Sequence, residues 1–455
     1  MTLLLPIYNG LRARNLFLTD LYPELLKQNI KLVILVPSHK AEYYRNTYKH
    51  QNVEFEEWNP APEHWLGRAL NAFAFNALGT GTVKQKQYIY YVRDGNLPKF
   101  LLRRLVALVC GGSRTVRRVI RALDRLVPID RELAAMLDKY QPSLVLAPDI
   151  ILASDRVLLR AAKRAGFKTV GMVRSWDNLT AKGVIQVMPE WLIAQTSRMK
   201  QEAIRFGDTE PDRVVVCGVA QFDEYWKPAT QTREDFLTSL GIPTDRRVVL
   251  CAPFFGEYSQ KSGIMLVEAL AKAIDDRKLP GDVHLLVRYR PEDGTTAEAP
   301  RSLNHPRITV TLPASKFFAT PRGRKDYEFT QEDVDLMIDS LRYSEVTLNT
   351  ISTLTVDAVA LDKPVINIRF DIDPDVEEGN RVKLYSHFDH YTALESTGGV
   401  RLAHSFDELL KHLNVYLKNP SQDVAGRAQI RREQIEFEDA GSGKRSADAI
   451  ANILN

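Results

Sequence analysis

The chain has 455 residues, of which 44% are hydrophobic and 26% are charged, and its formal net charge is +4. This length allows two domains with sizeable cores, and the mild positive charge does not indicate nucleic-acid binding. The three cysteines are widely separated and form no Cys-x-x-Cys pair, which fits a reducing compartment and excludes a cysteine zinc site or a disulfide framework. The start lacks a basic n-region, and no uncharged run approaches the roughly 18 residues of a membrane span, so we expect a cytoplasmic protein.

Short apolar strands alternate with helical patterns along the whole chain. In the first half we expect strands at 2–7, 31–36, 52–58, 143–148, 168–173, 191–195 and 213–218, and helices at 12–28, 62–80, 98–125, 130–140, 154–165 and 196–206. In the second half we expect strands at 247–254, 283–289, 307–312, 345–350 and 364–370, and helices near 263–276, 331–340, 352–361, 405–417 and 443–454. This alternation predicts parallel sheets that are covered by helices on both faces.

The segment from Tyr225 to Arg246 interrupts the alternation with proline, threonine and charged residues, and we interpret it as a linker with a short helix. The predicted fold is α/β, with two doubly wound Rossmann-like domains that face each other across a cleft. The first domain is expected to span residues 1–228 and the second 229–440. Ligands of such sheets bind beyond the carboxyl ends of the strands, so functional residues should follow strands.

Four strand ends of the second domain carry residues suited to a nucleotide donor. The candidate donor-binding residues, at three of these strand ends, are Gly256, Glu257, Arg288, Arg290, Ser352, Thr353 and Asp357; Arg369 and Asp371 follow the fourth strand. Arginines and a helix start both bind phosphate, through a rigid donor fork and through unpaired backbone N–H groups. The alternatives are a solvated arginine pair and an ordinary Ser/Thr helix cap, and Asp357 faces either a ribose hydroxyl or solvent. The chain has neither a Walker A loop nor a strand-GxGxxG-helix motif, which disfavours kinase, ATPase and dinucleotide oxidoreductase functions.

Polar residues also follow the strands of the first domain, where we expect the acceptor. The acceptor-side candidates are Asn9, Gly10, Arg12, Arg14, Trp176, Asn178 and Lys182. The loop "RSWDNLTAKG" at 174–183 contains Asp177, which is the first candidate for a general base that takes a proton from an acceptor hydroxyl. Its alternative is an Asx turn in which Asp177 and Asn178 bind their own backbone. Asp149 is the second candidate base, and His39 is the third.

Two further motifs resemble metal sites, but neither has a full set of ligands. "DIDPD" at 371–375 contains Asp-x-Asp, which we expect to be a solvated acidic loop. "HFDHY" places His387 and His390 three residues apart without an evident third ligand, so we expect either a polar loop near the donor or a structural pair. We therefore expect no metal and no cofactor.

The segment 98–125 combines basic and apolar residues. Its basic residues are Lys99, Arg103, Arg104, Arg114, Arg117, Arg118, Arg121 and Arg125, against Asp124 alone. One interpretation is peripheral contact with an anionic inner-membrane surface. The other is a core-facing helix with a basic solvent face. Gly111 and Gly112 should break the segment into two helices in either case.

Several of these stretches resemble bacterial surface-carbohydrate enzymes of the GT-B fold. They are "CGVAQFDEYW" at 217–226, "STLTVDAVALDKPVINI" at 352–368 and "DAGSGKRSADAIANIL" at 439–454, while "RSWDNLTAKG" resembles a segment of glycosyltransferases in that group. The second half is also similar to UDP-N-acetylglucosamine 2-epimerases and CDP-glycerol glycerophosphotransferases. The resemblance implies a nucleotide-sugar donor (UDP, CMP or CDP, or GDP) in the C-terminal domain and a saccharide or lipid-linked acceptor at the N-terminal one. It also implies that the last helix, within 441–455, crosses back to the first domain.

Our hypothesis is a metal-independent glycosyltransferase of cell-surface polysaccharide or glycolipid synthesis. Arg288, Arg290 and the helix start after Ser352 would stabilise the charge that develops on the leaving phosphate. Related enzymes carry His-Pro where this chain has Arg290–Pro291, so either Arg290 substitutes for the histidine or the donor differs. The alternatives are a UDP-N-acetylhexosamine 2-epimerase, a CDP-glycerol or ribitol phosphotransferase, and a non-catalytic binding protein.

Overall fold

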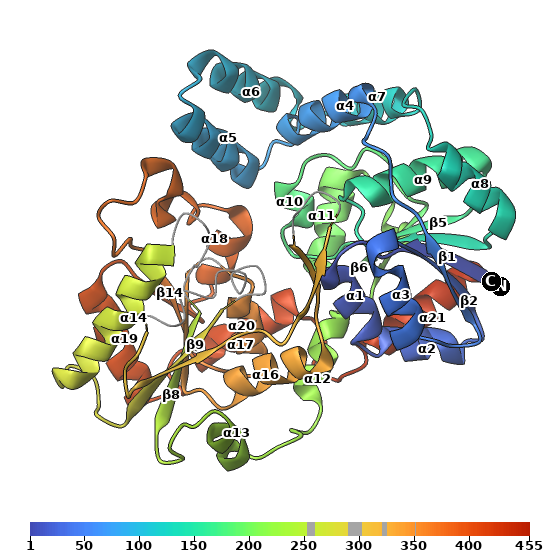
Figure 1. The fold of residues 1–455 in the computed structure, drawn as a ribbon. Coiled ribbons are helices and arrows are strands. Elements are labelled where there is room, and N and C mark those ends of the chain that lie inside the picture. The colour runs from blue at the N-terminus through green and yellow to red at the C-terminus, as the bar shows by residue number, and fades with distance from the viewer. Residues whose placement is uncertain (253–259, 290–302, 321–324, 351) are drawn as a thin grey trace. The chain divides into compact units, whose positions relative to one another are not determined.

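The structure is a computed structural model that describes residues 1–252, 260–289, 303–320, 325–350 and 352–455. The chain divides into two compact units, each built around one parallel sheet (Figure 1). The N-terminal unit comprises Met1–Trp226, Phe317–Glu328 and Glu433–Asn455, and the C-terminal unit comprises Lys227–Lys316 and Phe329–Arg432. The expected fold class, two doubly wound α/β domains, is confirmed.

The sheet of the N-terminal unit has seven parallel strands in the order β3-β2-β1-β4-β5-β6-β7. Its strands are β1 (Thr2–Pro6), β2 (Lys31–Val36), β3 (Val53–Glu57), β4 (Leu144–Ala147), β5 (Thr169–Met172), β6 (Trp191–Ala194) and β7 (Val214–Val216). Each coincides with an apolar run of the sequence, because strands that are buried on both faces need continuous apolar side chains. The strand order reverses between β1 and β4, which makes their carboxyl ends the switch point of this sheet.

Helices cover both faces of this sheet. The helices of this unit are α1 (Gly10–Phe17), α2 (Leu21–Lys27), α3 (Ser38–Thr47), α4 (Trp65–Asn76), α5 (Gly81–Asp94), α6 (Leu97–Cys110), α7 (Arg114–Asp124), α8 (Arg131–Tyr140), α9 (Ala153–Ala165), α10 (Asn178–Ala181), α11 (Ser197–Gly207), η1 (Pro211–Arg213), η2 (Ala220–Phe222), α12 (Asp223–Trp226) and α21 (Ser442–Leu454), of which α4–α7 pack on one another in a separate cluster. One core cluster joins the sheet to α1, α2, α3 and α21, and a second cluster on the other face joins it to α8 and α9. The sequence did not predict α3 or α5. The helix expected at 12–28 forms as α1 and α2, and the segment 98–125 is broken as expected into α6 and α7.

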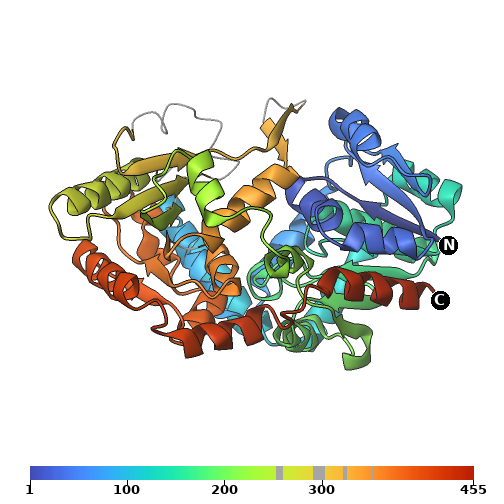
Figure 2. The same cartoon turned by 90° about the horizontal axis from the view of Figure 1, so that it is seen from below.

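The closing helix α21 packs against α2 within the N-terminal unit, and both chain ends lie close together there (Figure 2). Its start is held by Asp223, whose carboxylate accepts hydrogen bonds from the backbone N–H groups of Ser442 (3.0 Å) and Gly443 (2.7 Å). The side chain of Arg445 donates to the carbonyl of Cys217 at 3.0 Å. Two of the stretches that carry the family resemblance, 217–226 and 439–454, therefore bind each other directly.

The C-terminal unit has six parallel strands in the order β10-β9-β8-β13-β14-β15. Its strands are β8 (Arg247–Ala252), β9 (Val283–Arg288), β10 (Ile308–Thr311), β13 (Val346–Asn349), β14 (Val365–Ile368) and β15 (Arg401–Ala403). Its helices are α13 (Arg233–Ser239), α14 (Gln260–Asp275), α16 (Gln331–Arg342), α17 (Leu354–Ala360), η4 (Glu378–Asn380), η5 (Val382–Leu384), α18 (Asp389–Glu395), α19 (Phe406–Lys418) and α20 (Val424–Gln434). The order reverses between β8 and β13, which is the second switch point.

A hairpin of β11 (Lys316–Ala319) and β12 (Lys325–Glu328) departs from the expected domain layout. The prediction placed it in the C-terminal domain with the rest of 229–440, whereas Phe317–Glu328 groups with the N-terminal unit. The reason is a buried polar contact: Glu328 is 2% exposed and accepts hydrogen bonds from Lys40 Nζ and Tyr44 Oη, each at 2.6 Å. The ring of Phe318 also contacts the ring of Tyr43, with centroids 5.3 Å apart.

Candidate functional site

Two strand ends meet at the switch point of the N-terminal sheet, and polar side chains converge there. The β1–α1 loop places Arg12 in the first turn of α1, where Asn9 caps the helix by accepting from Arg12 N at 3.1 Å. The β4–α9 connection supplies Asp149, and the first turn of α9 supplies Asp155. We call Arg12, Asp149, Asp155, Arg174 and Asn178 the switch-point cluster.

Arg12 and Asp155 form a buried ion pair in this cluster. Arg12 Nη2 lies 3.1 Å from Asp155 Oδ2, and the two residues are 2% and 0% exposed. Burial raises the pKa of Asp155 to about 6, although the Arg12 charge opposes this shift. Arg12 Nε has no hydrogen-bond partner among the described residues, which leaves a buried donor that water or a ligand could satisfy.

Asp149 is the centre of the cluster and joins three chain segments. Its backbone N–H donates to Asp155 Oδ1 at 2.8 Å, and its carboxylate accepts from Arg174 Nε at 2.7 Å, Asn178 Nδ2 at 3.3 Å and Ile151 N at 3.2 Å. The residue is 1% exposed. Since these bonds occupy both carboxylate oxygens, the geometry suits Asp149 for fastening the 174–183 loop to the end of β4.

Of the two residues expected to form an Asx turn in the 174–183 loop, Asn178 is bound elsewhere, and for Asp177 the Asx turn remains a prediction. The Asn178 side chain reaches back to Asp149 instead of its own loop, and Asp177 makes no side-chain capping hydrogen bond to α10. The Asp177 carboxylate lies 3.4 Å from Lys182 Nζ, with side-chain exposures of 20% and 41%. Trp176 packs into the interior at 9% exposure. The loop therefore keeps Asp177 and Lys182 accessible while Trp176 and Asn178 anchor it.

A cavity adjoins the switch-point cluster. The strands β1, β4, β5 and β6 and the segment after β7 contribute its walls, and the polar or backbone groups lining it include Arg12, Asn15, Arg174, Gln195, Gly218 and Gln221. Arg14 lies nearby and donates hydrogen bonds to Asn15 and Gln221. Of the acceptor-side candidates, Arg12 therefore lines the cavity, whereas Asn9 acts as a helix cap.

His39 and Gly10 have other surroundings. His39 Nε2 lies 3.2 Å from Asp326 Oδ2 on the β12 hairpin, and its neighbour Lys40 lies 2.6 Å from the same carboxylate oxygen. A Cβ on Gly10 would lie 2.5 Å from the carbonyl oxygen of Tyr327, so the glycine allows the hairpin to approach α1 closely. The structure thus associates both residues with the hairpin.

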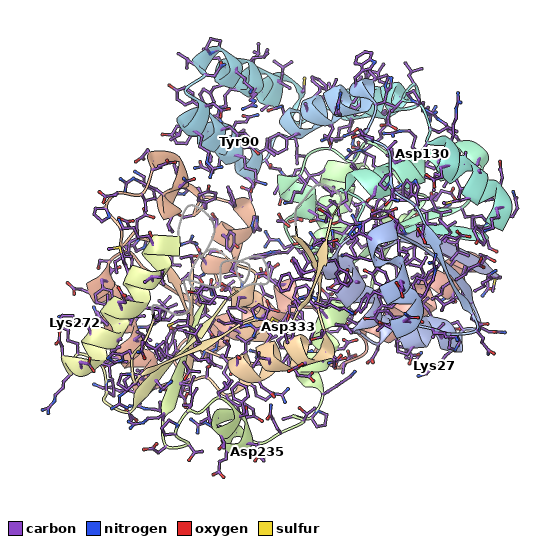
Figure 3. All side chains as sticks on the ribbon, viewed as in Figure 1. Lys27, Tyr90, Asp130, Asp235, Lys272 and Asp333 are labelled. Carbon is purple, nitrogen blue, oxygen red and sulfur yellow. The ribbon has the colours of Figure 1, made fainter. Side chains whose placement is uncertain are left out.

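In the C-terminal unit, three donor-binding candidates lie outside the described residues: Gly256, Glu257 and Arg290. Arg288 is described at the end of β9, where its Nη2 lies 2.9 Å from Asp333 Oδ1; the two side chains are 10% and 1% exposed. Ser315 Oγ donates to the other oxygen of this carboxylate at 2.9 Å. Asp333 lies at the start of α16 (Figure 3), so Arg288 joins β9 to a helix start.

The remaining donor-binding candidates lie at or near the start of α17, the helix between β13 and β14 in the chain. Ser352 Oγ accepts from Leu354 N at 3.2 Å, and Thr353 is the N-cap residue without a side-chain capping bond. Asp357 is 6% exposed, so the solvent-facing alternative for this residue is wrong. Beneath the helix start, Thr355 Oγ1 lies 2.9 Å from Asn367 Oδ1 on β14.

A second cavity lies at the carboxyl ends of β13 and β14, beside the start of α14. Its lining includes Ser262, Thr350, Ile368, Phe370, Asp371 and Asn380. The position is that of ligand sites in doubly wound sheets. This cavity and the start of α17 follow the same strand, β13, so both belong to the second switch point.

The acidic and histidine motifs differ from a metal site. Asp373 is 5% exposed and lies 3.1 Å from Lys261 Nζ, while Asp371 accepts from Val382 N at 3.0 Å, so the acidic loop is partly buried rather than fully solvated. His390 is buried against Tyr391, whereas His387 is exposed. Within the described ranges, no group of three or more His, Cys, Asp or Glu side chains could hold a metal ion.

Asp155, Arg174 and the pair of Lys40 with Glu328 were not predicted from the sequence. Asp155 lies in the first turn of a predicted helix that directly follows a strand, and this position was the available signal. Nothing local indicates that Glu328 is buried, because its partner Lys40 lies 288 residues away.

Comparison with known proteins shows the fold. Neither a family profile nor a curated protein sequence matches this chain. It is similar to the UDP-GlcNAc 2-epimerase from Neisseria meningitidis bound to UDP-GlcNAc (13% identity, 99% of this chain and 100% of that one, TM-score 0.55). It is also similar to the UDP-GlcNAc 2-epimerase from Methanocaldococcus jannaschii (12%, 99% and 100%, 0.55) and to a glycosyltransferase from Rickettsia africae (13%, 100% and 98%, 0.51). The chain thus has the two-domain GT-B fold.

Proposed function

We propose that this protein is a glycosyltransferase that moves a sugar from a nucleotide-activated donor to a hydroxyl acceptor in bacterial cell-surface polysaccharide or glycolipid synthesis. The observation that carries the proposal is the fastening of the 174–183 loop by Asp149: Arg174 of this loop lines a cavity, and Asp177 of the same loop stays partly exposed. The similarity to a glycosyltransferase and to an epimerase bound to UDP-GlcNAc supports a nucleotide sugar as the donor.

The donor would bind at the switch point of the C-terminal sheet. The start of α17, with Ser352 and Thr353, directly follows β13, and the partial positive charge of a helix start favours a phosphate there. Arg288 lies after the neighbouring strand β9 and is oriented by Asp333. The cavity beside β13 and β14 supplies an apolar wall and the Asp371 carboxylate. The expected donor nucleotides are UDP, GDP, CDP and CMP.

In the proposed reaction, the acceptor hydroxyl oxygen forms a bond to the anomeric carbon while the bond from that carbon to the phosphate oxygen breaks. The hydroxyl proton passes to the Asp177 carboxylate, and the nucleotide leaves with an additional negative charge. Arg288, Arg290 and the start of α17 would stabilise this charge electrostatically. Asp149 would act as a positioning residue because its oxygens already bind Arg174, Asn178 and Ile151.

The first experiment identifies the donor. A thermal-shift panel with UDP, GDP, CDP, CMP and dTDP should raise the melting temperature for one base, because a ligand at 100 times its Kd adds about 2.7 kcal/mol to the free energy of unfolding. No shift with any of the five nucleotides would contradict the donor site.

The second experiment tests the base. Replacing Asp177→Asn should lower the rate of glycosyl transfer by roughly 10²–10⁴ and leave the fold intact. Asp138→Asn, an exposed aspartate on α8, is the matched control. Near-normal turnover of the Asp177 variant would remove this residue from the role.

A second candidate function is a UDP-N-acetylhexosamine 2-epimerase. It is favoured by the adjacent carboxylates Asp149 and Asp155, of which burial raises the pKa of Asp155 to about 6, since epimerisation needs groups that exchange protons. Incubation with UDP-N-acetylglucosamine alone separates the two functions. An epimerase converts it without a second substrate, whereas a transferase forms a glycoside only when an acceptor is added.

A further inference from the structure

The solvent-facing side of α6 is apolar. The exposed fractions of its large apolar residues are Leu97 48%, Leu101 56%, Leu102 62%, Leu105 56%, Leu108 81% and Val109 67%. Only Ala107 of this helix is buried. An ordinary surface helix turns its apolar stripe toward the core and its charged side toward water. The core-facing helix with a basic solvent face, one of the two interpretations from the sequence, is therefore not what α6 forms.

Basic residues flank this apolar stripe. Lys99 and Arg104 are exposed at its edges, and Arg103 lies over the ring of Tyr90 on the neighbouring helix α5 (Figure 3). Arg104 similarly lies over the ring of Phe100. The aliphatic stems of these side chains extend the apolar surface, while their cationic heads remain at its border.

The helix α7 continues the same arrangement. Its inward arginines, Arg117 and Arg121, bind Asp208 at 2.5 Å and 3.0 Å. Its outward side carries Val119 (50% exposed) and Leu123 (41%), with Leu126 (67%) just beyond the helix. The basic residues Arg118 and Arg125 are exposed on the same helix or at its end, and Arg114, also exposed, lies 3.5 Å from Asp208. The sole acidic residue of 97–126, Asp124, is buried and paired with Arg160.

We propose that these outward residues of α6 and α7, which we call the α6–α7 face, rest on the surface of an anionic lipid bilayer. The leucines and valines would enter the boundary between headgroups and acyl chains, and the arginines would contact lipid phosphates. Charge complementarity selects this partner over a second copy of the chain, because pairing two such faces would bring like charges together. No helix that the described residues form is long and apolar enough to cross a membrane.

The test is co-sedimentation of the full chain with vesicles. We expect binding to vesicles of phosphatidylcholine with phosphatidylglycerol, much weaker binding to phosphatidylcholine alone, and loss of binding as salt is raised. Replacing Arg118→Gln and Arg125→Gln together should lower the partition coefficient roughly 25-fold, about fivefold for each charge. The matched control is Lys272→Gln with Lys411→Gln, two exposed lysines of the C-terminal unit; Lys272 lies on α14 (Figure 3).

The apolar contribution is tested separately. Leu105→Glu with Leu108→Glu should lower vesicle binding at least about a hundredfold, while Leu312→Glu, at a leucine 45% exposed elsewhere, should have no effect. These leucines contact solvent, so thermal unfolding of the variants should match the wild type and exclude misfolding as the cause.

Two results would overturn the proposal. The first is equal, negligible binding to both kinds of vesicle. The second is a wild-type dimer in sedimentation velocity that Leu105→Glu with Leu108→Glu converts to a monomer, because the face would then bind a second copy. Both measurements are independent of glycosyl transfer, so they leave the proposed function untouched.

Discussion

The role of Asp149 can be separated from that of Asp177 by a pair of isosteric substitutions. In the wild type, Arg174 Nε lies 2.7 Å from one Asp149 carboxylate oxygen, and Ile151 N donates to the other. Asp149→Asn keeps its one carbonyl oxygen for Ile151 N and turns its amide N–H₂, a donor, toward the Arg174 donor. Asp177→Asn removes a charge that pairs with Lys182 at 3.4 Å. The two changes have the same chemistry but occur in opposite environments.

The expected magnitudes follow from burial. A hydrogen bond between charged groups contributes about 1.5–3 kcal/mol, and breaking a buried ion pair costs about 3–5 kcal/mol. Asp149 is buried but the Arg174 side chain is 26% exposed, so water can partly solvate the unpaired guanidinium. We therefore expect Asp149→Asn to lower the free energy of unfolding of the N-terminal unit by about 3 kcal/mol. Asp177→Asn should change it by less than about 1 kcal/mol, since its partner is exposed.

Thermal unfolding followed by circular dichroism measures this difference. For a unit of this size, about 3 kcal/mol corresponds to a decrease in melting temperature of about 6–12 °C. Amide hydrogen exchange should also become faster across 174–183 in the Asp149 variant, because the loop loses its link to β4. Exchange in the C-terminal unit serves as the internal control.

A melting temperature of Asp149→Asn within about 2 °C of the wild type, together with unchanged exchange across the loop, would refute this reasoning. It would mean that the ion pair with Arg174 is not formed in solution. The proposal that Asp149 positions the loop would then fail, and Asp149 would return as a candidate base.

Three further outcomes are expected. Burial raises the pKa of Asp155 to about 6, above its unfolded value, so the contribution of Asp155 to stability is largest at low pH and is lost as the pH rises through 6. From pH 7 to pH 5, the free energy of unfolding of the wild type, measured in urea, should rise by about 1.4 kcal/mol relative to that of Asp155→Asn. Parallel pH profiles of the two proteins would contradict this. Lys40→Met should lower the free energy of unfolding by about 3–5 kcal/mol, because Glu328 would stay buried without its cation. If the hairpin resists limited proteolysis equally well in the variant and the wild type, the result would argue against that contact. Gly10→Ala should lower the free energy of unfolding by about 1–3 kcal/mol, because its Cβ would lie too close to Tyr327 O. The control is Gly281→Ala, where a Cβ meets open space. Equal stability of both variants would show that the hairpin lies farther from α1.

The strands and their order of appearance could be predicted from local pattern. The runs at 2–7, 31–36 and 143–148 are apolar throughout, as strands covered on both faces must be, and each forms a strand of the first sheet. The three-residue strand β15 and the hairpin β11–β12 escaped prediction, because short or amphipathic segments carry too few residues for a periodic signal.

The candidate site could be predicted only in part from the sequence. Placing polar residues after strands led to Arg12, Asp149 and the 174–183 loop, because parallel strands end at one edge of a sheet. The partners of these residues could not be read from the same pattern. Arg288 was expected to bind phosphate, yet its neighbour in space is Asp333, 45 residues along the chain.

The sequence by itself determined that two parallel sheets form, and it predicted the longer apolar strands and the strongly periodic helices, whereas α3, α5, β15 and the β11–β12 hairpin escaped prediction. Tertiary structure alone decided which side chains pair and which side of an amphipathic helix meets water. Residue spacing sets how a segment can fold, but it carries no information on what packs against it. For α6, the apolar stripe was visible in the sequence, and only the packing of the surrounding helices shows that it faces outward.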